Sequence, residues 1–65
     1  MRNTTKLKHL LQLYTLTFDM DEDEKIILTA IHKRSQMMET FADKSYSTVV
    51  GKAFSFMMRE IKKPL

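Results

Sequence analysis

A chain of 65 residues has room for one small domain, and a core of that size is marginal without a cross-link, a metal or a second subunit. The sequence contains no cysteine, which excludes disulfides and thiolate metal sites and makes oligomerisation the expected source of extra stability. The net charge of +3 is ordinary for a small domain. The excess lies in the C-terminal half, however, which is compatible with a polyanionic partner.

No apolar run approaches the ~20 residues that cross a bilayer, and the N-terminus is unlike a secretory signal, because charged Lys residues precede the first Leu cluster. We therefore expect a cytoplasmic protein without a membrane anchor. His9 and His32 are the only histidines, and neither has a neighbour at metal-ligand spacing. With no cysteine nucleophile and no Gly-rich phosphate loop, the sequence predicts neither catalysis nor a cofactor or metal site.

Residues 1–13 are expected to form a basic arm or a short helix. Leu7, Leu10 and Leu11 fall at i, i+3 and i+4, which is typical of one face of a helix, and Thr4 or Thr5 is a possible cap. The basic side chains of this segment are Arg2, Lys6 and Lys8.

Residues 14–20 alternate between apolar and polar side chains, which predicts a half-buried strand. The alternative is a helix that extends from residue 4 to residue 18, because Tyr14 and Phe18 also continue the apolar face of the preceding segment. Thr15 and Thr17 disfavour that helix, since β-branched residues are poor in a helix interior. No other segment repeats the alternation, so the strand is expected to pair with its copy in a second subunit.

Residues 21–42 are predicted to form a helix, which either bends or ends near Arg34 or places Arg34 at its rim beside Glu39 or Glu60. The acidic residues at 19–24 precede it, where the helix dipole favours negative charge. An arginine would otherwise lie inside the apolar face, where a charge is costly. The residues of that face are Ile26, Ile27, Ala30, Ile31, Met37, Met38, Phe41 and Ala42.

Residues 47–62 are predicted to form the last helix, with Ser45 or Ser47 as its cap and Pro64 beyond its end. Its apolar side chains cover about half of the circumference, which favours burial on two sides, in a dimer core or a three-helix bundle. Gly51 in mid-helix suggests a close helix crossing. The apolar set is Val49, Val50, Ala53, Phe54, Phe56, Met57, Met58 and Ile61, and the polar face carries Thr48, Lys52, Ser55, Arg59 and Lys62.

The order of strand, acidic-led helix, Ser-capped turn and amphipathic helix over residues 14–62 resembles the ribbon-helix-helix family of small dimeric DNA-binding proteins. The resemblance implies a two-stranded ribbon in the major groove, with Thr15 and Thr17 as candidate base contacts. It also implies phosphate contacts at the start of the last helix. The candidate phosphate contacts are Lys44, Ser45, Ser47, Thr48, Lys52, Arg59, Arg2, Lys6 and Lys8, and the candidate dimer or partner interface is Tyr14, Leu16, Phe18, Val50, Phe54, Met57, Met58 and Ile61.

We therefore expect a mainly α chain: a short N-terminal helix, one strand and two helices in a ribbon-helix-helix-like homodimer. Its expected function is to bind duplex DNA as a transcriptional regulator or a plasmid or phage accessory factor. The alternative is an all-α bundle of three helices, at residues 4–18, 21–42 and 47–62. That bundle would serve as an adaptor or inhibitor of a larger protein, without binding nucleic acid.

Overall fold

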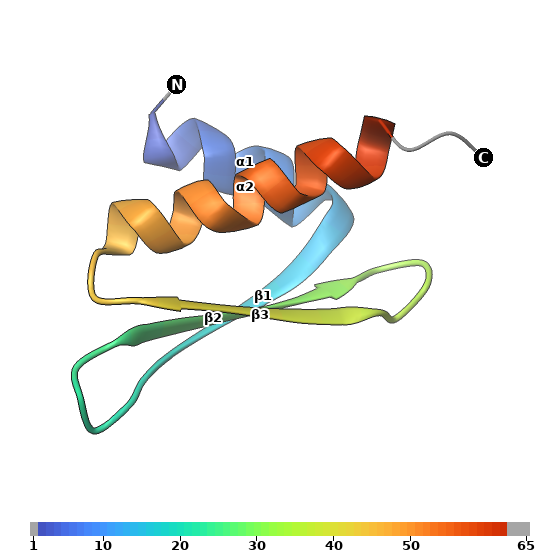
Figure 1. Cartoon of the computed structure of the whole chain (residues 1–65). Helices are drawn as coiled ribbons and strands as arrows, with labels where there is room; N and C mark the ends of the chain where they lie inside the picture. Colours follow the sequence, from blue (N-terminus) through green and yellow to red (C-terminus); the bar gives the residue numbers. More distant parts are fainter. Residues whose placement is uncertain (1, 63–65) are drawn as a thin grey trace.

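The computed structural model describes residues 2–62 and has the element order helix, three strands, helix (Figure 1). The three strands form one antiparallel sheet in the order β1-β2-β3. Both helices lie over the same face of that sheet. The elements are α1 (Asn3–Leu13), β1 (Tyr14–Met20), β2 (Ile26–His32), β3 (Met38–Asp43) and α2 (Tyr46–Lys62).

The expectation of a mainly α chain with a single strand is wrong, and so is the three-helix alternative. Residues 21–42, which we expected to form one helix, hold a turn, strand β2, a second turn and most of strand β3. The cause is that β2 is the central strand, so its residues are sheltered by both neighbouring strands and by the helices. A short, continuous apolar run of this kind fits a buried strand as well as a helix.

Strand β1 occupies the segment where alternation predicted a strand, but its partner belongs to the same chain. It pairs with β2 along its whole length, from Tyr14 opposite His32 to Met20 opposite Ile26. The backbone groups of β1 that face β2 are therefore paired within the chain, and its other side is an outer edge of the sheet. The argument for an intermolecular ribbon no longer holds, and the strand-helix-helix order behind the family resemblance is absent from residues 14–62.

The acidic residues before β2 close a hairpin and do not begin a helix. The Oδ1 atom of Asp21 accepts hydrogen bonds from the backbone N–H groups of Asp23 and Lys25, both at 2.9 Å. Glu24 has a φ of 62°, in the left-handed region that tight turns use. A side-chain acceptor at the first position of a turn supplies the bonds that a helix would otherwise make.

Arg34 lies in the exposed turn between β2 and β3, so it interrupts no apolar face. The Nδ1 atom of His32 accepts hydrogen bonds from the backbone N–H groups of Arg34, at 3.1 Å, and Ser35, at 3.3 Å. Gln36, with a φ of 64°, completes the reversal of the chain.

The core lies between the helical layer and the sheet. Leu28 and Val49 are completely buried, and Gly51 has no atom within 4 Å of the position that a Cβ would occupy. Gly51 therefore does not mark a close helix crossing. Among the described residues, no helix is long and apolar enough to span a membrane. The buried core residues are Leu10, Tyr14, Leu28, Ala30, Val49, Val50, Ala53 and Met57.

Candidate functional site

The polar face of α2 forms one side of a shallow groove on the helical layer. Lys52 and Arg59 lie two turns apart on this face, with Thr48 and Ser55 between and beside them, and all four side chains are exposed. The sequence predicted this face from its spacing. The structure adds a cation from α1, because Lys6 lines the same groove.

Lys6 is positioned by an aromatic ring of the neighbouring helix. Its Nζ atom lies 5.9 Å from the centroid of the Phe54 ring, at a distance where a cation is attracted to the ring face. Phe54 in turn packs against the core, so the ring is fixed by burial on one side. Three cations from two helices, Lys6, Lys52 and Arg59, therefore border one groove.

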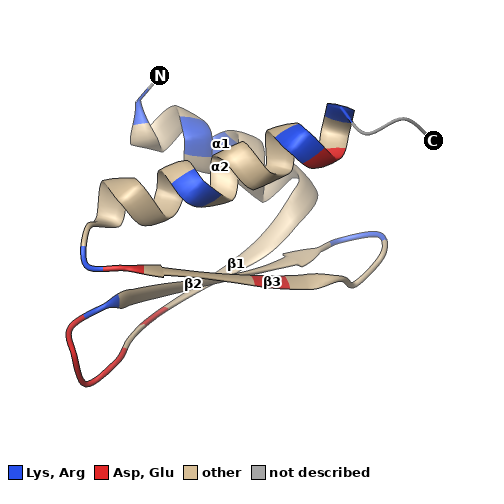
Figure 2. Ribbon diagram, viewed as in Figure 1, with Lys and Arg blue, Asp and Glu red and all other residues tan. Residues whose placement is uncertain are grey.

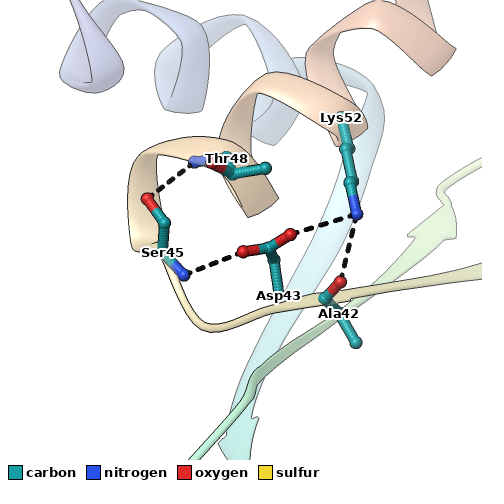
Figure 3. Close-up of polar contacts among 5 residues, drawn as sticks. All are labelled: Ala42, Asp43, Ser45, Thr48 and Lys52. Atoms are coloured by element: carbon teal, nitrogen blue, oxygen red, sulfur yellow. Dashed lines mark hydrogen bonds and ion pairs between the residues drawn. The ribbon is translucent and has the colours of Figure 1, made fainter.

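The start of α2 is held by a network of hydrogen bonds around Asp43 (Figure 3). The Oδ1 atom of Asp43 accepts a bond from the backbone N–H of Ser45 at 3.1 Å, and the Ser45 Oγ accepts one from the N–H of Thr48 at 3.3 Å. The Ser45 N–H bond, and next the Lys52 ammonium, hold the pKa of the Asp43 carboxyl below its ordinary value. Of the two serines that the sequence offered as caps, Ser45 is the one that caps α2.

Lys52 is attached to the same network. Its Nζ atom donates to the backbone oxygen of Ala42 at 3.3 Å and lies 3.4 Å from Oδ2 of Asp43 (Figure 3). Both side chains are substantially exposed, and an ion pair of this kind contributes little to stability. Lys52 can therefore leave the Asp43 carboxylate and bind another anion at a small cost in folding free energy.

The other candidate contacts divide between the two faces of the molecule. Ser47 accepts a hydrogen bond at 2.8 Å from the side-chain amide of Asn3, which links the first turns of the two helices. Arg2, Lys8 and Lys44 are exposed on or beside the helices. Thr15 and Thr17 stand opposite Ile31 and Thr29 on the sheet face that turns away from the helices. Thr15 and Thr17 therefore cannot line the same groove as the cations of α2.

The residues expected at an interface mostly belong to the core of this chain. Tyr14, Val50 and Met57 are buried, and Leu16, Phe54 and Met58 pack against the core from its edge. Two of the expected interface residues keep a large exposed area: Phe18, whose ring lies 5.9 Å from that of Tyr46, and Ile61.

Charge is segregated between the two layers, which sequence order concealed. The helical layer, residues 2–13 and 44–62, contains seven Lys or Arg residues and one Glu, for a net charge of +6. The sheet layer, residues 14–43, contains three Lys or Arg residues and seven Asp or Glu residues, for a net charge of −4. Figure 2 shows the basic residues along α1 and α2 and the acidic cluster at the β1–β2 turn.

A pocket that the sequence did not indicate opens beside the C-terminal end of α2, between Tyr14 and Glu60. In residues 2–62 there is no group of three or more His, Asp or Glu side chains that could hold a metal ion. Comparison with known proteins gives no matching family model, no similar curated protein and no similar solved structure.

Proposed function

We propose that this protein binds duplex DNA through phosphate contacts made by the basic groove of its helical layer. The observation that carries the proposal is the segregation of charge, +6 on the helices against −4 on the sheet, with Lys6, Lys52 and Arg59 bordering one groove. A surface with this distribution is attracted to a polyanion in one orientation only. The acidic β1–β2 turn then lies away from the phosphates.

The contacts available are of the kind that position a protein on a duplex without reading its sequence. Lysine and arginine bind phosphate by charge, and the hydroxyls of Thr48 and Ser55 can donate to phosphate oxygens from the same face. The candidate base contacts Thr15 and Thr17 lie on the opposite face of the molecule, so they cannot read bases while the groove holds the phosphates. Binding is therefore of low sequence preference, unlike the base reading that the family resemblance implied.

The expected salt dependence follows from the number of cations at the groove. If three or four phosphates are neutralised, log K against log salt has a slope of about −2.7 to −3.6 for B-DNA. Raising the salt from about 50 to about 200 mM then weakens binding roughly 40- to 150-fold. With this function we also propose a cytoplasmic location, as expected from the sequence.

The test is the affinity of two charge-matched double variants for a fluorescein-labelled duplex, measured by anisotropy at low salt. Lys6→Gln with Arg59→Gln removes two cations from the groove, and Lys25→Gln with Lys33→Gln removes two cations from the turns of the sheet layer. The groove variant should lose about 1.8 from the magnitude of the salt slope, and the turn variant should keep the wild-type slope. Equal losses in the two variants, or no binding by the wild-type chain, would contradict the proposal.

A further inference from the structure

A second recess, separate from the basic groove, lies where the ends of several elements meet. It has a volume of about 480 Å³ and is lined by the end of α1, the first residue of β1, the last residue of β2, the β2–β3 turn, Glu39 of β3 and the last turns of α2. None of its lining residues also lines the basic groove. In Figure 1 the β2–β3 turn and the acidic β1–β2 turn lie at opposite ends of the sheet, so this pocket is also remote from the acidic cluster.

The walls of the pocket are mainly apolar. Leu13, Tyr14 and Phe56 form its buried and half-buried part. Met37 and Ile61 line it from the outside, with 69% and 58% of their surfaces exposed. Exposed methionine is a flexible apolar side chain that adapts to different partner shapes. An apolar recess with an exposed apolar rim is typical of a surface that a partner covers.

The charged groups of the pocket all have the same sign. Glu39 and Glu60 line it, and no Lys or Arg of residues 2–62 does. Burial, and then the negative charges of Glu60 and Glu39, raise the pKa of the Tyr14 hydroxyl, which places both carboxylates within electrostatic reach of the pocket floor. The His32 ring meets the Tyr14 ring edge-on, with centroids 5.1 Å apart. Its Nδ1 atom accepts hydrogen bonds from the backbone N–H groups of Arg34 and Ser35 in the β2–β3 turn.

We propose that this pocket binds a segment of a partner protein in which an apolar side chain is adjacent to a Lys or Arg. The apolar side chain would enter between Tyr14 and Phe56, and the cation would face Glu39 and Glu60. Charge complementarity selects this occupant, because the pocket is acidic on a chain whose net charge is +3. The exposed rim at Met37 and Ile61 selects a protein segment over a small molecule, which would leave that rim in water.

The same charges exclude nucleic acid from the pocket, since carboxylates repel phosphates. The two sites therefore serve different partners and share no lining residue, so the chain can hold DNA and a second protein at once. The pocket proposal does not depend on the proposed function, and each can fail separately.

The direct test is a titration of isotope-labelled protein with the blocked peptide acetyl-Arg-Leu-Phe-Arg-amide, followed by backbone amide shifts. We expect saturable shifts at Tyr14, Glu39 and Ile61, and none in the β1–β2 turn. Two control peptides separate the contributions: acetyl-Glu-Leu-Phe-Glu-amide should not bind, and acetyl-Arg-Ser-Ser-Arg-amide should bind far more weakly. Absence of saturable shifts up to about 5 mM peptide, or equal binding of the apolar and Ser-containing basic peptides, would overturn the proposal.

Variants locate the charge that the peptide recognises. Glu39→Gln with Glu60→Gln should weaken binding roughly tenfold, because two partly exposed charge pairs are lost. Glu22→Gln with Glu24→Gln removes the same charge from the β1–β2 turn and should leave the affinity unchanged. Ile61→Ser tests the apolar rim at an exposed position, where the fold does not depend on the side chain, and should also weaken binding. An affinity loss in the turn variant that equals the loss in the pocket variant would refute the assignment.

Discussion

Replacing Leu28 with alanine tests the strand assignment of β2 most sharply, because the helical and strand interpretations make opposite predictions there. A helix over 21–42 would place Ile27 on the buried face and leave Leu28 outside it. In the structure Leu28 is 0% exposed among Leu10, Tyr14 and Val49, whereas Ile27 points to the face away from the helices and is half-buried. The two residues are neighbours, so Leu28→Ala and Ile27→Ala form a matched pair.

The magnitude follows from the burial of each side chain. Removing a completely buried Leu side chain costs about 2–5 kcal/mol, from lost transfer free energy and the cavity left behind. Ile27→Ala loses strand preference and partial packing, which costs about 1 kcal/mol. A domain of this length has a total stability of roughly 3–10 kcal/mol, so Leu28→Ala removes a large part of it.

The measurement is urea unfolding of both variants, followed by far-ultraviolet circular dichroism and extrapolated to water. We expect the free energy of unfolding of Leu28→Ala to be at least about 1 kcal/mol below that of Ile27→Ala, or Leu28→Ala to be unfolded without urea. If Ile27→Ala is the more damaging of the two, β2 does not have the register described here, and the fold itself is refuted.

Two further predictions concern stability. Gly51→Ala should raise the free energy of unfolding by about 0.5–1 kcal/mol, because the site is in mid-helix and has no atom within 4 Å of the new Cβ; a loss in thermal melting would show a hidden contact. Asp43 is more stable as a carboxylate in the folded chain, since its pKa is lowered from 3.8, chiefly by the Ser45 N–H bond. Its contribution is therefore fully present above that ordinary value and is lost as the pH falls through the lowered pKa. Acid unfolding followed by circular dichroism should show a flatter pH dependence in Asp43→Asn, and an unchanged profile would contradict this role.

The sequence indicated the elements in which apolar and polar side chains lie on clearly separate faces. Tyr14 to Met20 alternates because only one face of an edge strand meets the helices, and α2 shows a broad apolar arc because it packs on α1 and on the sheet. Strand β2 was missed because Ile27 and Ile31 on its outer face are apolar like the buried Leu28 and Ala30, and the resulting apolar run also fits helical spacing. The acidic turn was misread because carboxylates favour both a helix start and a turn.

The candidate site was visible only in part, for a reason of topology. The polar face of α2, with Lys52 and Arg59, follows from spacing alone. Lys6 lies beside this face only in the folded chain, because the fold places the first turn of α1 beside the first turn of α2. The hydrogen bond between Asn3 and Ser47, which are 44 positions apart in the sequence, joins these two turns. Lys6 lies in the N-terminal half of the sequence and Lys52 and Arg59 in the C-terminal half, but all three belong to the helical layer of the fold. The pocket at Glu39 and Glu60 requires the same tertiary information.

The most direct test of the central claim is a map of backbone amide shifts when a short DNA duplex is added to isotope-labelled protein at low salt. We expect the largest changes to fall along the groove, at Lys6, Lys52 and Arg59, and to disappear when salt is raised. Residues of the acidic β1–β2 turn should be unaffected. Changes centred on Thr15, Thr17 and Thr29 would place the duplex on the open face of the sheet and would contradict the account.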